Sequence, residues 1–258
     1  MLKVGETIPG ALENQEITDS PGRSIPKWLV DIVELVHEQR GIGWQFGVET
    51  YTPPETRPLD RPTFLKISFY HLLTNFLMVD TLDTIIKQIP GVGTQEGGSI
   101  FFPHLPPLQR YTVSTIIHFL TGCRFLAQFA LAFYATSVVA IGLFNAEPRD
   151  WPPIQEQPGK SQSMHELWGK RWHQMLRQLF MVYGGYPGYW IGGNLGMALG
   201  TFLGSGLYHE LAMYALGRGW EWHSFIFFAM QGPILMFERV WRRVTGRRIG
   251  GRLGQVRV

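Results

Sequence analysis

Residues 178–209 read QLFMVYGGYPGYWIGGNLGMALGTFLGSGLYH and contain no Asp, Glu, Lys or Arg. Two further uncharged runs cover residues 125–146 and 222–237. A helix needs about 20 mostly apolar residues to cross the hydrocarbon core of a bilayer. These runs therefore predict an all-α, polytopic membrane helix bundle, although a mean hydropathy of -0.01 over 258 residues resembles that of a soluble protein.

The composition excludes several classes of protein. Charged residues make up 17% of the chain and aromatic residues 14%, which argues against a disordered chain or a coiled coil. A single Cys rules out an intramolecular disulfide and an all-Cys metal site. The net charge of +3 is too small to indicate a nucleic-acid partner, so none is expected.

About four spans are expected, at residues 63–86, 111–144, 189–216 and 222–240. The first is interrupted by Lys66, His71, Asn75, Asp80 and Asp83. Polar residues inside a span face a bundle interior or water, so this segment either spans with that orientation or lies in the interface. The second contains Arg124 and exceeds one crossing, which predicts a tilted, broken or extended helix.

The chain divides into four regions. Residues 1–62 form a polar segment with a short amphipathic helix (about 24–39) and an RGIGW loop, and residues 63–144 form membrane helices. Residues 145–240 hold the motifs described below, and residues 241–258 form a basic tail. Seven arginines follow Glu238 with no acid among them, which places the C-terminus in the cytosol. Four spans then place the N-terminus on the same side.

Residues 163–178, SMHELWGKRWHQMLRQ, predict a helix over about 164–183. Ser163 and Glu166 have the spacing of a capping box, which marks a helix start. Wound as a helix, the segment places Trp168, Trp172, Met175, Leu176 and Leu179 on one side and its cations on the other. An amphipathic helix in the cytosolic membrane interface is the simplest interpretation.

Gly192, Gly196, Gly200 and Gly204 recur every four residues, so one helix face offers bare backbone to a neighbouring helix. His209 and Glu210 follow near the end of this uncharged run. An ionisable residue in such a place is a functional candidate, and His suits proton transfer near neutral pH. A structural histidine bonded to a neighbouring carbonyl remains an equal alternative.

No metal site is expected. HELWG (165–169) and HELAM (209–213) both lack the second His of a zinc-binding H-E-x-x-H helix.

Four motifs together resemble a known family. They are RGIGW (40–44), WPP (151–153), MHELWGKRWHQ (164–174) and SGLYHEL (205–211). Their order and spacing are similar to those of the wax synthase-like branch of the membrane-bound O-acyltransferases, whose fungal members act in secondary metabolism. The resemblance implies that residues 145–240 are a catalytic core. It also implies transfer of an acyl group, most often acetyl from acetyl-CoA, onto a hydroxyl of a terpenoid or related lipophilic scaffold.

The resemblance also assigns site residues. His209 matches the membrane-embedded catalytic histidine, which as a neutral imidazole would take the proton of the alcohol. His173 occupies a position that plant members fill with Asn, which leaves open an acid–base, oxyanion-donating or substrate-positioning role. Trp168, Arg171 and Trp172 would shape the path of acyl-CoA, and Lys170, Arg171 and Arg177 would meet its phosphates.

The expected partners are acyl-CoA as co-substrate, a lipophilic alcohol and the lipid bilayer, with no permanently bound cofactor. The expected location is the endoplasmic reticulum. Two alternatives stay open: a long-chain acyl-CoA:alcohol wax ester synthase, and a noncatalytic membrane protein. Full-length relatives carry apolar helices before the RGIGW motif where this chain has a polar segment, so a truncated chain, a natural short form and an inactive remnant are all compatible with the sequence.

Overall fold

The computed structural model describes residues 39–42, 45–47, 50–92, 98–247 and 249. Over these ranges the regular elements are all helices, which confirms the all-α expectation. The chain divides into two compact units, Pro54–Pro153 and a second unit made of Met1–Pro53 with Ile154–Val258. The short helix expected at about 24–39 and the last nine residues of the basic tail lie outside the described residues, apart from Gln39.

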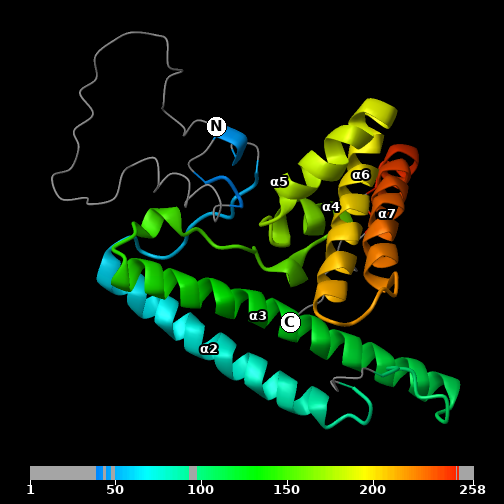
Figure 1. The fold of residues 1–258 in the computed structure, drawn as a ribbon, viewed down its shortest axis with the longest axis horizontal. Coiled ribbons are helices and arrows are strands. Elements are labelled where there is room, and N and C mark those ends of the chain that lie inside the picture. The colour runs from blue at the N-terminus through cyan, green and yellow to red at the C-terminus, as the bar shows by residue number, and fades with distance from the viewer. Residues whose placement is uncertain (1–38, 43–44, 48–49, 93–97, 248, 250–258) are drawn as a thin grey trace. The chain divides into compact units, whose positions relative to one another are not determined.

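The Pro54–Pro153 unit is a hairpin of two long helices, α2 (Arg61–Lys87) and α3 (Pro107–Leu143), which lie side by side (Figure 1). α2 begins at this point because the Asp60 carboxylate accepts a hydrogen bond from Thr63 N at 3.1 Å, which satisfies an amide of the first turn. The fully or nearly buried side chains of the two helices are small or apolar: Phe64, Ser68, Ile86, Ser114, Ile117, Ala127, Phe133, Ser137 and Ile141.

Polar residues of α2 also face α3. Arg124 Nε lies 2.9 Å from Asp83 Oδ1, and the His71 ring stacks on Tyr134 with 4.9 Å between centroids. Two of the residues that interrupt the apolar run of 63–86 therefore have partners on the neighbouring helix. Such pairing is what makes ionisable groups tolerable in an apolar helix pair.

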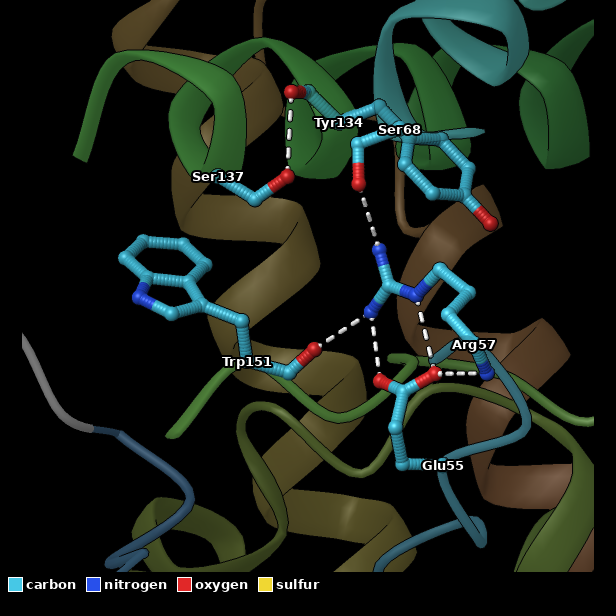
Figure 2. A network of polar contacts seen from close by, with 6 residues as sticks. All are labelled: Glu55, Arg57, Ser68, Tyr134, Ser137 and Trp151. Atoms are coloured by element: carbon cyan, nitrogen blue, oxygen red, sulfur yellow. Dashed lines mark hydrogen bonds and ion pairs between the residues drawn. The ribbon is translucent and has the colours of Figure 1, made fainter. Parts of the chain in front are cut away.

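A buried guanidinium closes one end of this hairpin (Figure 2). Arg57 donates to both carboxylate oxygens of Glu55 and, at 3.0 Å, to Ser68 Oγ on α2. It also donates to the carbonyl oxygen of Trp151 at 2.6 Å, and it lies 4.0 Å from the centre of the Phe64 ring. One charged side chain thus holds the loop before α2, α2 itself and the start of the WPP segment together.

α3 is the one described helix that is long and apolar enough to cross a membrane. Its bounds are close to the span expected at 111–144. The expected bundle of about four spans is not confirmed. α2 carries Lys66, Asp80 and Asp83, which lower its apolar character, and α7 (His223–Thr245) ends in a run rich in arginine.

The span expected at 189–216 is wrong as a single helix. α6 (Tyr186–Ala215) is interrupted at Gly192 and Gly193, where Gly193 has φ 59° and ψ -147°. This backbone region is open essentially to glycine alone. The chain reverses there, so that residues up to Ile191 run back against residues from Asn194 onward (Figure 1).

The expected glycine face exists for Gly196, Gly200 and Gly204, whereas Gly192 lies at the reversal with nothing within 4 Å of an added Cβ. The partner of this face is the preceding part of the same chain. A Cβ added to Gly200 would lie 2.0 Å from the carbonyl oxygen of Gly184, and one added to Gly196 would lie 2.0 Å from that of Gly188. The two arms of this glycine hairpin, residues 177–191 and 194–215, therefore touch backbone to backbone. Facing glycines permit this approach, as in helix pairs within membranes.

The single amphipathic helix expected over 164–183 is also wrong. The segment consists of α4 (Met164–Glu166), a π-helical turn η4 (Leu167–Arg171), an irregular stretch, α5 (Arg177–Phe180) and a second π-helical turn η5 (Met181–Gly185). The break has an identifiable cause. Gln174 is 3% exposed and its side-chain amide donates to the carbonyl oxygens of Trp168 and Trp172, which takes the place of backbone donors.

Candidate active site

His209 lies on α6, and its tautomer follows from its hydrogen bond. Nδ1 is 2.7 Å from the carbonyl oxygen of Ser205, one helical turn earlier. A carbonyl oxygen only accepts, so Nδ1 carries the hydrogen. In the neutral ring, Nε2 then holds the lone pair that can accept a proton.

Aromatic rings surround the His209 imidazole. Phe228 of α7 stacks on it with 4.1 Å between centroids and 25° between planes, and Phe180 lies 6.1 Å away. Tyr208 stands nearly perpendicular at 5.6 Å. These contacts fix the plane of the imidazole and reduce its contact with water.

His173 lies in the irregular stretch between η4 and α5, close to His209. Burial, together with the nearby positive charge that His209 can carry, lowers the pKa of His173 to about 4. His173 is therefore neutral at physiological pH. The two histidines predicted from the sequence lie close enough to interact electrostatically, although 36 residues separate them in the chain.

Trp168 and Trp172 belong to the same cluster. The Trp168 ring lies 5.8 Å from both Trp172 and Phe202 and 6.0 Å from Phe228, and the Trp172 ring lies 5.3 Å from His173. The Trp168 indole N–H donates to Gln231 Oε1 at 3.2 Å. Both tryptophans thus form part of the wall around the histidine pair.

Arg171 and Arg177 have different hydrogen-bonding partners. Arg171 forms ion pairs with Glu166 at 2.6 Å and Glu156 at 3.6 Å, so its guanidinium is held by carboxylates of the protein. Arg177 donates to the carbonyl oxygen of Gly169 at 3.2 Å and to Gln174 Oε1 at 2.9 Å. Only Arg177 of these two also lines the cavity described next.

A cavity of about 900 Å³ lies beside the motif segment (residues 163–173), among η4, α6 and α7. Four cations line it together with two carboxylates: Lys170, Arg177, Arg239 and Arg242 with Glu166 and Glu238. The lining also includes apolar residues of α6 and α7, namely Leu195, Ala198, Leu235 and Met236. A ligand with phosphate groups and an extended organic body fits this mixture. In the described ranges, no three His, Cys, Asp or Glu side chains gather as a metal site would need.

Glu210, the second ionisable residue of the uncharged run, has a different place from His209. It is 2% exposed, and its Oε1 accepts from the backbone amides of Glu221 and Trp222, each at 2.7 Å. Its Oε2 accepts from Phe225 N at 3.4 Å. A carboxylate at a helix N-terminus is favoured by the exposed amides and by the helix dipole. Glu210 therefore joins the end of α6 to the start of α7.

Three residues of α7 at the site were missed by the sequence reasoning. Phe228, Gln231 and Glu238 follow one another at spacings of three and seven residues, which places them along one side of the helix. Glu238 accepts hydrogen bonds from the backbone amides of Met164 and His165. The signal was present: Gln231 and Glu238 lie in register within and directly after the uncharged run 222–237, and so mark the side of the helix that faces protein.

Comparison with known proteins relates one part of the chain to a known family. Residues 151–230 match the membrane bound O-acyl transferase family, which confirms the resemblance found in the sequence. This part of the chain is thus similar to a segment of the membrane-bound O-acyltransferases. Together with the apolar helix α3, the match indicates a membrane protein.

Individual relatives are similar over longer stretches. An acetyltransferase, eriL, of Hericium erinaceus is 24% identical over 222 residues, 80% of this chain and 55% of the relative. Acetyltransferase aurG of Calcarisporium arbuscula is 28% identical over 148 residues, 53% of this chain and 35% of the relative. Acyl-CoA–sterol O-acyltransferase 1 of Arabidopsis thaliana is 31% identical over 137 residues, 48% of this chain and 37% of the relative. The chain spans about half the length of the first of these, and no solved structure matches it.

Proposed function

We propose that this protein is an acyl-CoA-dependent O-acyltransferase that moves an acetyl group from acetyl-CoA onto a hydroxyl of a lipophilic secondary metabolite such as a terpenoid. The observation that carries the proposal is the histidine pair within the matched segment, with His209 Nδ1–H bound to Ser205 and Nε2 left as a base. The relatives named acetyltransferases support acetyl as the transferred group.

The chemistry follows from these two side chains. Nε2 of His209 takes the hydroxyl proton of the alcohol while the alcohol oxygen attacks the thioester carbonyl carbon. His173, which is neutral, donates a hydrogen bond to the oxyanion that forms. The C–S bond then breaks, the sulfur of coenzyme A receives the proton from His209, and the ester is released. Exclusion of water by the surrounding rings protects the thioester from hydrolysis.

The cavity offers the binding site for coenzyme A in this proposal. Lys170 and Arg177, predicted from the sequence, would bind its phosphates together with Arg239 and Arg242. Arg171 is better assigned to holding the motif segment, because two carboxylates already occupy its guanidinium. Its substitution would act through the position of Trp168 and Trp172.

The test is transfer of radiolabelled acetyl from acetyl-CoA by membranes that contain the full chain, with a panel of terpenoid, sterol and long-chain alcohols. Labelled ester that depends on His209 supports the proposal. Absence of ester with every donor and acceptor, at confirmed protein level, contradicts it.

A sterol acceptor is the second candidate, because the Arabidopsis relative named acyl-CoA–sterol O-acyltransferase is 31% identical. The same assay separates the two: ergosterol or cholesterol acetylated faster than any terpenoid alcohol would favour the sterol reading. Location in the endoplasmic reticulum with both termini cytosolic belongs to the proposal as well. A protease-protected C-terminal tag in sealed microsomes would contradict that topology.

A further inference from the structure

We propose that Glu238 and Gln231 of α7 are positioning residues that hold the motif segment (residues 163–173) against His209. The inference rests on the proposed function, since it concerns how that site is assembled. It starts from one side of α7, where Phe228, Gln231 and Glu238 each contact a different part of the site.

Glu238 holds the start of the motif segment through its backbone. Oε1 accepts from Met164 N at 3.2 Å, and Oε2 accepts from His165 N at 2.9 Å. Both bonds are charge-assisted, which makes them stronger than bonds between neutral groups. Ser163 Oγ accepts from Glu166 N at 3.0 Å, so the amides at this helix start divide between a local cap and a carboxylate from α7.

Gln231 holds the middle of the same segment. It is 5% exposed, and its Nε2 donates to the carbonyl oxygen of Phe227 at 3.0 Å. This bond turns Oε1 toward the Trp168 indole, which donates to it at 3.2 Å. Three residues earlier, Phe228 stacks on His209. α7 is therefore the common support of both histidine-bearing segments.

The Glu238 charge has a second effect that can be separated from the first. Glu238 lines the cavity beside Lys170, Arg239 and Arg242, where a negative charge repels an anionic ligand. Replacing it by Gln removes the repulsion and also loses one of the two amide bonds, since a Gln side chain has only one acceptor oxygen. Binding of coenzyme A and turnover should then change in opposite directions.

The experiment compares Glu238→Gln, Gln231→Leu and a control, Glu221→Gln, in the full chain in nanodiscs. Glu221 is a suitable control because its side chain is 66% exposed and, among the residues that the structure describes, forms an ion pair only with His223. Three quantities are measured: the Kd of free coenzyme A, kcat with acetyl-CoA, and hydrogen exchange of the backbone amides of residues 164–172.

We expect Glu238→Gln to bind coenzyme A roughly twofold to fivefold more tightly, to turn over about tenfold more slowly, and to exchange amide hydrogens faster at 164–165. Gln231→Leu should lower kcat by a similar factor with an unchanged Kd, because Gln231 does not line the cavity. A variant that had merely lost its fold would weaken binding and turnover together.

Unchanged exchange at 164–165 in Glu238→Gln would overturn the inference, and so would weaker coenzyme A binding together with lower kcat. The same holds if the control changes as much as the two test variants. Failure of the proposed function would look different: the wild type would form no ester, while the exchange data would still report whether Glu238 holds the segment.

Discussion

The chain contains two helical hairpins, and the contacts inside one differ in kind from those inside the other. Side chains fill the interface of the α2–α3 hairpin, and Arg57 and the Asp83–Arg124 pair add polar contacts to it. The arms of the glycine hairpin meet through their backbones at Gly184–Gly200 and Gly188–Gly196. An interface of side chains can adjust by changing rotamers, whereas an interface of backbones cannot. The rigid hairpin is also the one that carries His209.

The largest expected effect separates the two hairpins by function. His209→Ala should lower acetyl transfer by about 10²–10⁴-fold, because the reaction loses the base that takes the proton of the alcohol. His71→Ala, which removes the histidine stacked on Tyr134 in the other hairpin, should leave transfer within about twofold. Labelled-ester assays on membranes matched for protein level decide this. Substantial turnover by His209→Ala would return His209 to a structural role.

The next effect tests the backbone interface. Gly200→Ala should destabilise the protein by about 3 kcal/mol or more, since the new methyl would sit 2.0 Å from a carbonyl oxygen that cannot move by changing a rotamer. Gly122→Ala is the matched control on α3, where an added Cβ meets nothing within 4 Å and the change should be neutral or slightly stabilising. Thermal unfolding in detergent measures both. Equal midpoints for the two variants would show that the arms are not in contact.

A smaller effect tests the reversal between the arms. Gly193→Ala should cost about 1–3 kcal/mol, because its φ of 59° with ψ of -147° strains any residue that has a Cβ. Gly192→Ala, one residue earlier at φ -136° with open space around it, should cost less. The difference between the two variants in the same unfolding assay is the readout. If both behave alike, residues 189–216 form a continuous helix as the sequence alone predicted.

The smallest effect is a pH dependence that belongs to the unit with the site. His173 has a pKa of about 4 when folded and about 6.5 when unfolded, so the unfolded chain binds the proton first as pH falls. The neutral, buried His173 therefore contributes to the free energy of unfolding above pH 6.5. This contribution is lost toward pH 4, by about 2 kcal/mol between pH 7 and 4.5. His173→Asn, which cannot titrate, should lose less stability over that interval. An identical pH profile of unfolding for the two proteins would contradict the low pKa.

His173→Asn also bears on catalysis, because an amide can donate to an oxyanion as a neutral imidazole does. We expect it to keep measurable transfer, whereas His173→Leu should lose most of it. Loss of transfer in both variants would exclude a role as a simple hydrogen-bond donor and favour proton transfer by His173 itself.

The sequence predicted much of this architecture. Uncharged runs and periodicity predicted an all-helical chain and the approximate bounds of α3 and α7, and the ordered motifs predicted that His173 and His209 belong together. The reversal at Gly192–Gly193 could not be predicted, because an uncharged run of this length suits one long helix as well as two short arms. The glycine spacing indicated a face open to close packing, but spacing does not reveal which segment packs there.

The break within 164–183 was missed for a different reason. Wound as a helix, this segment has a clear apolar side, and only the tertiary position of Gln174 shows that its side chain competes for the backbone carbonyls of Trp168 and Trp172. Similarly, Arg171 looks like a free cation in the sequence, while Glu156 and Glu166 neutralise it in the fold. Both cases are decided by side-chain contacts that helical periodicity does not encode.

The facing glycines also fix the register between the two arms of the glycine hairpin, and with it the position of His209. Gly184 pairs with Gly200 and Gly188 with Gly196, and a Cβ on Gly204 would approach the carbonyl oxygen of Phe180 to 3.7 Å. The two arms are antiparallel, so a glycine four residues earlier in the first arm faces a glycine four residues later in the second. One residue inserted near the reversal would turn the second arm by about 100°, which would move every glycine off the shared face and carry His209 away from Phe180. The length of this segment is therefore as constrained as its composition, and an insertion there should be far less tolerated than one in the loops outside the hairpin.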